Sequence, residues 1–271
     1  MLRVIILTHG GAEALINRLS KLSGVRIAAI LLEAPSRPHR SLGTRLSRSL
    51  KYEGYLATLR KLVSSTLLRS TGAEILKRIN EQQGDLEEFA AQQKIPLYRV
   101  DDYHSQSSLR LIESLHPDLG ILYGTNIIRE DVFGIPRLGS INLHQGLAPL
   151  YRGGPTVFWE LFNGEPEVGI TVHFVVSKVD AGDIIAQQRM PLNYDFAVYG
   201  LEYERFLQDY RRSLKEPSVE LIATAVESIA RGAVPRTEQD LSIGKRYRLP
   251  TKREKDQLRR ILRERSGVIS H

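Results

Sequence analysis

The most informative part of the sequence is residues 140–185, SINLHQGLAPLYRGGPTVFWELFNGEPEVGITVHFVVSKVDAGDII. It opens with a short apolar run that carries Asn142 and His144, two residues apart, near its end. Because alternate residues of a strand point to the same side, both side chains should lie on one face at the strand's carboxyl end. Residues 167–185 then have the pattern of two strands joined by a turn that contains Asp180. We expect this turn to fold back over the Asn-x-His pair.

The chain before this stretch alternates between apolar runs and amphipathic helical patterns. The apolar runs cover residues 2–7, 25–33, 95–100 and 118–124. This alternation predicts an α/β fold with a Rossmann-like, mostly parallel sheet and helices on both of its faces. Ligands of such sheets bind beyond the carboxyl ends of the strands, which is where the Asn-x-His pair lies.

Two segments depart from this alternation. Residues 34–94 form a long, basic insertion between the second and third strands, and we interpret it as helical with a solvated cationic face. The alternative is a lid or a docking surface for an anionic partner. Residues 191–271 carry two helical patterns and many basic side chains. We therefore expect a main domain over residues 1–190 and a small, mainly helical C-terminal extension.

Composition excludes several kinds of site. The 271 residues include no Cys, so disulfides, thiolate metal sites and a Cys nucleophile are impossible. The N-terminal apolar run is shorter than a signal peptide or a membrane span requires, so we expect a cytoplasmic protein without a membrane partner. The formal net charge of +7 favours anionic ligands, such as the phosphates of a substrate or of nucleic acid.

Two other sequence features give only weak evidence for a ligand site. Gly10-Gly11 follows the first strand, but it does not form the G-x-G-x-x-G pattern of a dinucleotide site, so a tight turn is the better interpretation. His173 falls within a strand pattern and has no second ligand at metal-binding spacing. We therefore expect no metal site.

Asn142, His144 and Asp180 together provide the groups that acyl transfer to an amine requires. The amide can donate to a developing oxyanion, and the imidazole can stabilise charge or move a proton. A carboxylate beside the imidazole should raise its pKa.

The same stretch resembles the folate-dependent formyltransferase family, which includes the methionyl-tRNA, glycinamide and amino-sugar formyltransferases. The motifs NLH, GLAPLYRG, WELFNG, GITVH and DAGDII follow one another in the order of the family's formyl transferase N-terminal domain. The resemblance implies that residues 1–190 form the catalytic domain and that Asn142, His144 and Asp180 are the catalytic residues. It also implies that 10-formyltetrahydrofolate is the formyl donor.

The resemblance further implies that the pterin lies between the main chain of residues 125–128 and that of residues 175–180. The expected folate-binding residues are Thr125, Asn126, Ile127, Ile128, Gly146, Leu147, Val175 and Val179. Gly146 and Ala148 stand where the family usually has Ser and Leu. These departures affect the surroundings of the site and leave the three catalytic positions filled.

The resemblance says less about the formyl acceptor than about the donor, because residues 191–271 do not resemble the β-barrel domain of methionyl-tRNA formyltransferases. We expect a small-molecule amine, including a nucleotide-linked amino sugar, as the acceptor. The alternatives are a formyltetrahydrofolate hydrolase, a methionyl-tRNA formyltransferase-like enzyme and a basic RNA-binding protein with a degenerate transferase core. Nucleic acid is a partner only in the last two of these. The sequence does not predict the oligomeric state.

Overall fold

A computed structural model describes residues 1–33, 51, 81 and 83–266. The predicted basic insertion therefore lies mostly outside the described residues. Its last part is described, and residues 83–92 of it are helical.

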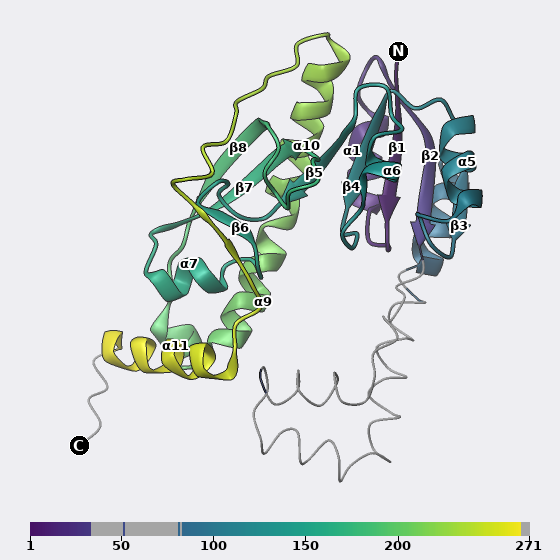
Figure 1. Cartoon of the computed structure of the whole chain (residues 1–271). Coiled ribbons are helices and arrows are strands. Elements are labelled where there is room, and N and C mark those ends of the chain that lie inside the picture. The colour runs from purple at the N-terminus through teal and green to yellow at the C-terminus, as the bar shows by residue number, and fades with distance from the viewer. Residues whose placement is uncertain (34–50, 52–80, 82, 267–271) are drawn as a thin grey trace.

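Seven strands form one sheet with the order β3-β2-β1-β4-β5-β7-β8 (Figure 1). The strands are β1 (Leu2–Thr8), β2 (Val25–Glu33), β3 (Leu97–Val100), β4 (Leu119–Tyr123), β5 (Ser140–His144), β7 (Glu167–Phe174) and β8 (Ile184–Pro191). The first five strands pair in parallel, while β7 and β8 pair antiparallel with their neighbours. The predicted α/β fold with a mostly parallel sheet is confirmed.

Helices cover both faces of the sheet, as the apolar runs predicted. The helices with assigned bounds are α1 (Glu13–Ser20), α5 (Gln106–Ser114), α6 (Glu130–Phe133), α7 (Phe158–Asn163), α8 (Phe196–Tyr199), α9 (Tyr203–Ser213), α10 (Lys215–Ala230) and α11 (Lys252–Arg265). Buried residues of β1 alternate between two cores: Ile6 packs with α1 and α10, and Ile5 packs with α5 and α6. This alternation explains why β1 reads as a continuous apolar run.

The C-terminal region is mainly helical, as expected. Helices α9 and α11 form a third core with α7, centred on buried residues such as Phe158, Tyr203 and Leu258. A capping box formed by Thr251 and Glu254 fixes the start of α11. Among the helices of the described residues, none has the length and apolar character that crossing a membrane requires.

Two short strands were not predicted. Strand β9 (Lys245–Tyr247) pairs in parallel with β6 (Tyr151–Gly153) in a separate two-stranded sheet. A strand of three residues is too short to show a periodic pattern, so sequence patterns do not reveal it. Its pairing brings the basic segment 245–248 beside the Tyr-Arg-Gly-Gly motif.

Candidate active site

Strands β5 and β7 bring the polar residues of the site together. In their antiparallel register, Asn142 pairs with His173 and His144 pairs with Thr171. The turn after β7 carries Asp180, whose φ of 49° lies in the left-handed region that Asp tolerates better than most residues. A Cβ on Gly182 would lie 2.0 Å from the carbonyl oxygen of Phe174, so only glycine allows the turn to close this tightly. The turn therefore folds back over the end of β5, as expected.

The Asp180 carboxylate lies at the centre of the cluster. Its Oδ1 is 3.4 Å from Asn142 Nδ2 and 3.4 Å from His173 Nε2. Its Oδ2 is 3.4 Å from His144 Nδ1 and accepts a 2.8 Å hydrogen bond from the main-chain N–H of Gly153. The structure thus brings together the three residues that the sequence predicted and adds His173 to them.

Charge and hydrogen bonding keep Asp180 ionised. Burial alone would raise the pKa of its carboxyl group, but the His173 hydrogen bond, the charge of His144 and the Gly153 N–H together hold this pKa well below its ordinary value. Asp180 therefore carries its negative charge throughout the neutral pH range.

The pKa of His144 is shifted in the opposite direction to the one expected. Its Nε2 donates a 2.7 Å hydrogen bond to the carbonyl oxygen of Tyr151, while its Nδ1 faces Asp180. Burial lowers the pKa of the imidazole, and this effect outweighs the rise that Asp180 and the Tyr151 carbonyl cause. The predicted effect of the carboxylate is present, but desolvation, which the sequence does not show, decides the net direction.

Gly146 makes room for this position of the imidazole. A Cβ at residue 146 would lie 2.3 Å from His144 Nε2 and 2.8 Å from the carbonyl oxygen of Tyr151. The Ser that the family resemblance leads one to expect at this position would collide with both groups. The departure at Gly146 is thus linked directly to how His144 is held.

His173 is the site residue that sequence reasoning passed over. It is 2% exposed, its Nδ1 donates a 2.8 Å hydrogen bond to the carbonyl oxygen of Phe174, and its Nε2 lies 3.3 Å from Asn142 Nδ2. The signal for its role was its register opposite Asn142, which depends on how two distant strands pair. In the described part of the chain, no three His, Asp or Glu side chains are arranged to hold a metal ion.

A cavity of about 170 Å³ opens beside the cluster. Its lining residues are Leu122, Thr125, Asn126, Ile127, Ile128, Asn142, His173, Val175, Val176, Ser177, Lys178, Val179 and Asp180. They include six of the eight residues expected to bind folate. The other two lie elsewhere, because Gly146 is next to His144 and Leu147 packs against Gly169 of β7.

The size and walls of this cavity limit what it can hold. It is smaller than the roughly 300–1,000 Å³ of pockets that enclose whole drug-sized ligands, so it would hold only part of the molecule. Its walls combine apolar side chains with two loop segments whose main-chain groups can donate and accept hydrogen bonds.

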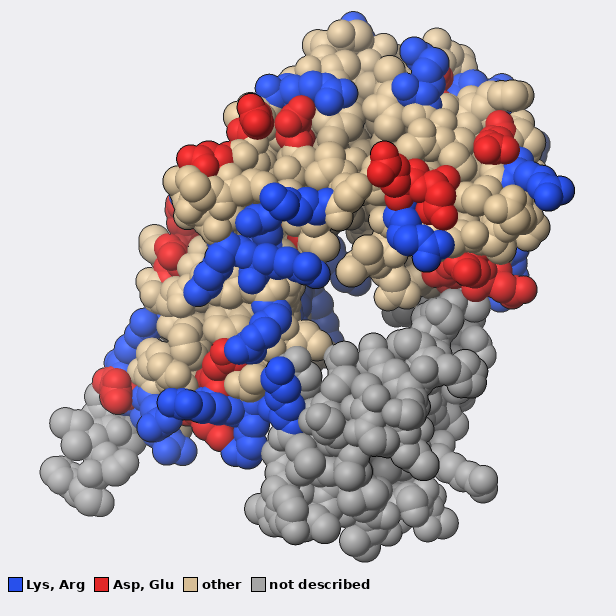
Figure 2. Space-filling view, viewed as in Figure 1, with Lys and Arg blue, Asp and Glu red and all other residues tan. Residues whose placement is uncertain are grey.

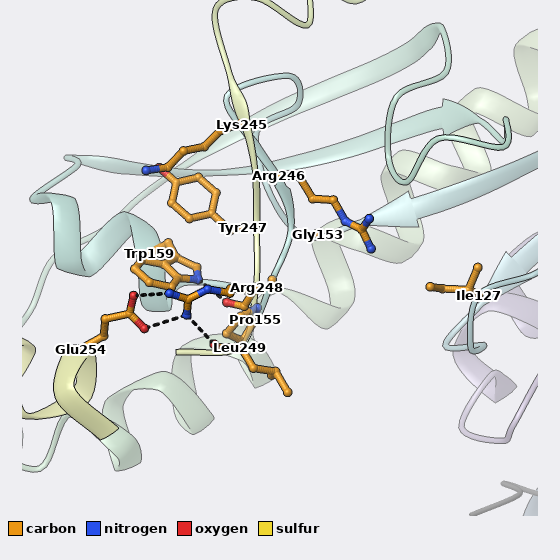
Figure 3. A pocket seen from close by; sticks show the side chains of 11 residues that line it. Ile127, Gly153, Pro155, Trp159, Lys245, Arg246, Tyr247, Arg248, Leu249 and Glu254 are labelled. Carbon is orange, nitrogen blue, oxygen red and sulfur yellow. Dashed lines mark hydrogen bonds and ion pairs between the residues drawn. The ribbon is translucent and has the colours of Figure 1, made fainter. Parts of the chain in front are cut away.

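A larger cavity, of about 800 Å³, lies on another side of the cluster (Figure 3). The residues that line it are Ile127, Gly153, Gly154, Pro155, Trp159, Lys245, Arg246, Tyr247, Arg248, Leu249 and Glu254. Ile127 lines both cavities, and Gly153 donates to Asp180. The cluster thus lies next to two separate binding spaces.

Comparisons with known proteins identify related sequences and related folds. The family model described as formyl transferase matches residues 51–222, which is more than half of the chain. A methionyl-tRNA formyltransferase of Roseiflexus sp. (strain RS-1) is 32% identical over 148 residues, which cover 54% of this chain and 42% of that protein. The chain therefore spans less than half the length of that relative.

Solved structures share the fold at low sequence identity. A phosphoribosylglycinamide formyltransferase from Anaplasma phagocytophilum superposes with a TM-score of 0.53 at 20% identity, covering 86% of this chain and 88% of that one. A sugar N-formyltransferase from Shewanella sp. FDAARGOS_354 superposes with a TM-score of 0.53 at 17% identity, covering 92% and 77%. Together with the family match and the motifs around Asn142, His144 and Asp180, these findings show that the chain belongs to the formyl transferase family.

Proposed function

We propose that this protein transfers a formyl group from 10-formyltetrahydrofolate to a primary amine of a small acceptor. The observation that carries the proposal is the Asp180 carboxylate, which lies within 3.4 Å of Asn142, His144 and His173 between two cavities. Membership of the formyl transferase family supports the type of group transferred. The relatives named above differ in their acceptors, so the acceptor must be argued from this chain's own cavities.

The folate is assigned to the smaller cavity, with its ring between the loops 125–128 and 175–180. When bound there, it supplies the formyl carbon that the amine attacks. The main chain of these loops orients the ring, while Ile128 and Val175 exclude water from one side of it. Asn142 and Asp180 line the same cavity, so both can reach a formyl group at its inner end.

Asn142 is assigned the role of stabilising the negative charge that develops on the formyl oxygen. Its Nδ2 points to Asp180 and His173 at 3.4 and 3.3 Å, and hydrogen bonds of this length are weak. The amide can therefore give up one of them and donate to the oxygen as the amine attacks. A donor placed in this way typically contributes about 10² to 10³ in rate.

Asp180 and His144 are assigned the transfer of the proton that the amine loses. As the new C–N bond forms and the bond from the formyl carbon to the folate nitrogen breaks, a proton passes from the amine to the leaving nitrogen. The ionised Asp180 accepts a hydrogen bond from the N–H of the incoming amine, and its Oδ2 lies 3.4 Å from the unprotonated Nδ1 of His144. Because burial lowers the pKa of His144, its imidazole is largely neutral at pH 7 and can take up a proton during the transfer.

The test is direct formylation. The protein is incubated with 10-formyltetrahydrofolate and a panel of amines that includes phosphorylated amino sugars, simple amino sugars and an aminoacyl-tRNA. Mass spectrometry then detects the gain of one formyl group. The proposal predicts formylation of a small amine in an enzyme-dependent reaction. Release of formate alone, with no formylated amine, would favour the hydrolase.

A further inference from the structure

We propose that the larger cavity holds the amine acceptor and that Arg246 binds a phosphate group on it. This inference rests on the proposed formyl transfer and adds the chemical class of the acceptor, which is a small phosphorylated amine.

The cavity lies next to the reacting groups. Gly153 forms part of its wall and donates its main-chain N–H to Asp180 Oδ2 at 2.8 Å. Ile127 lines both this cavity and the smaller one assigned to folate. A ligand in the larger cavity can therefore bring an amine to Asp180 while the smaller cavity is filled.

The pairing of β6 with β9 places Arg246 in the wall of the larger cavity. Arg152 pairs with Arg246 and Gly153 with Tyr247, so the basic segment runs directly alongside the Tyr-Arg-Gly-Gly motif. Lys245 and Arg246 point to opposite sides of β9, and Arg246 extends toward the side where Ile127 lies (Figure 3). Its Cγ is 3.2 Å from where a Cβ on Gly153 would be. The missing side chain at Gly153 thus lets the stem of Arg246 lie against the main chain that contacts Asp180.

Arg246 has charge available for a ligand. Within the residues that the structure describes, no carboxylate forms an ion pair with it. Arg248, two residues along, forms two hydrogen bonds of 3.0 Å with Glu254, which is the only acidic side chain among the described residues of the wall. Lys and Arg side chains gather beside the hollow in the middle of this face (Figure 2). A guanidinium group that lacks an acidic partner binds phosphate well, since its planar fork can donate two parallel hydrogen bonds.

The other walls suit the uncharged part of a small molecule. The volume of about 800 Å³ lies within the range of pockets that enclose drug-sized ligands, about 300–1,000 Å³. Ile127 is 71% exposed and Leu249 is 49% exposed at its edges, so a ligand would cover apolar surface there. The ring of Tyr247 is stacked on that of Tyr151, with their centroids 5.0 Å apart. This stacking fixes the inner wall of the cavity before any ligand binds.

The experiment measures binding of UDP and of inorganic pyrophosphate by isothermal titration calorimetry. The test variants are Arg246→Gln, which removes the charge, and Arg246→Lys, which keeps the charge but loses the planar fork. The control is Arg110→Gln, an exposed substitution on α5 with the same change of charge. The thermal shift caused by a non-reactive folate analogue is recorded for every variant.

We expect wild-type protein and Arg110→Gln to bind UDP equally. Arg246→Gln should weaken binding by about tenfold, as expected for one charge-assisted hydrogen bond, and Arg246→Lys should lie between them. The folate shift should be the same in all four proteins. Equal UDP affinity in wild type and Arg246→Gln would overturn the inference, as would a folate shift in a protein that binds neither probe. Binding of a structured RNA that is lost in Arg246→Gln, without binding of UDP, would replace the small acceptor with an RNA. Absence of the folate shift from wild type would instead count against the proposed function.

Discussion

Gly146 provides a sharp test of how the site holds His144. In Gly146→Ala, the new Cβ would lie 2.3 Å from His144 Nε2, so the ring must move by about 1 Å to reach an ordinary contact distance. That movement breaks the 2.7 Å hydrogen bond to the Tyr151 carbonyl, and losing a buried hydrogen bond costs about 1–3 kcal/mol. The φ of Gly146 lies outside the left-handed region, so Ala adds no backbone strain. The expected loss comes from the collision alone.

Two measurements check this effect. For a chain of this size, about 2–4 °C is lost per kcal/mol, so the melting temperature of Gly146→Ala should fall by roughly 2 to 12 °C. The pKa of His144, followed by NMR of its ring protons, should fall, because the hydrogen bond to the Tyr151 carbonyl that raises it is lost while the ring stays buried. Gly84→Ala is the control, because nothing lies within 4 Å of its Cβ and Gly84 lies in a helix, where Ala is favoured. Unchanged stability together with an unchanged His144 pKa would show that Gly146 does not determine how the ring is held.

Three further predictions concern buried charge, the carboxylate and folate. Burial raises the pKa of the Glu160 carboxyl from 4.5 to about 7. The contribution of the protonated carboxyl to the free energy of unfolding is therefore complete below pH 4.5 and is lost as pH rises through 7. Glu160→Gln should therefore raise the free energy of unfolding by up to about 3 kcal/mol at pH 8.5 and change it little at pH 4; equal effects at both pH values would count against a buried carboxyl group. Asp180→Asn should lower the formyl-transfer rate by about 10² or more and lower the pKa of His144 further, with folate affinity nearly unchanged; if rate and pKa both stay the same, Asp180 only forms the turn. A non-reactive folate analogue at 100 times its Kd should stabilise the protein by about 2.7 kcal/mol, whereas NADH should not, and the reverse pattern would favour a dinucleotide site.

The sheet and its polar end could be predicted because they depend on local patterns. The apolar runs of β1, β2 and β4 are continuous since helices cover both faces of the sheet. Asn142 and His144 lie two residues apart on a strand, so their common direction follows from strand geometry. Asp180 required a further assumption, that the turn after β7 folds back over β5.

The remaining features depend on contacts between distant segments. His173 joins the cluster only because β7 pairs with β5 in one particular register. The net pKa direction of His144 depends on how deeply the ring is buried, which residue types do not reveal. The cavity beside Arg246 exists because β9 pairs with β6 across a separation of more than 90 residues, and a strand that short leaves no periodic signal.

The most direct test of the central claim is the rate of formyl transfer in Asn142→Ala. Single-turnover transfer from 10-formyltetrahydrofolate to an amine that the wild-type protein formylates is compared with folate-analogue affinity, measured on the same preparations. We expect a rate about 10² to 10³ lower, because the amide no longer donates to the formyl oxygen, with folate affinity within a few-fold of wild type. Transfer at nearly the wild-type rate, with folate affinity intact, would contradict the assignment of this cluster as the catalytic centre.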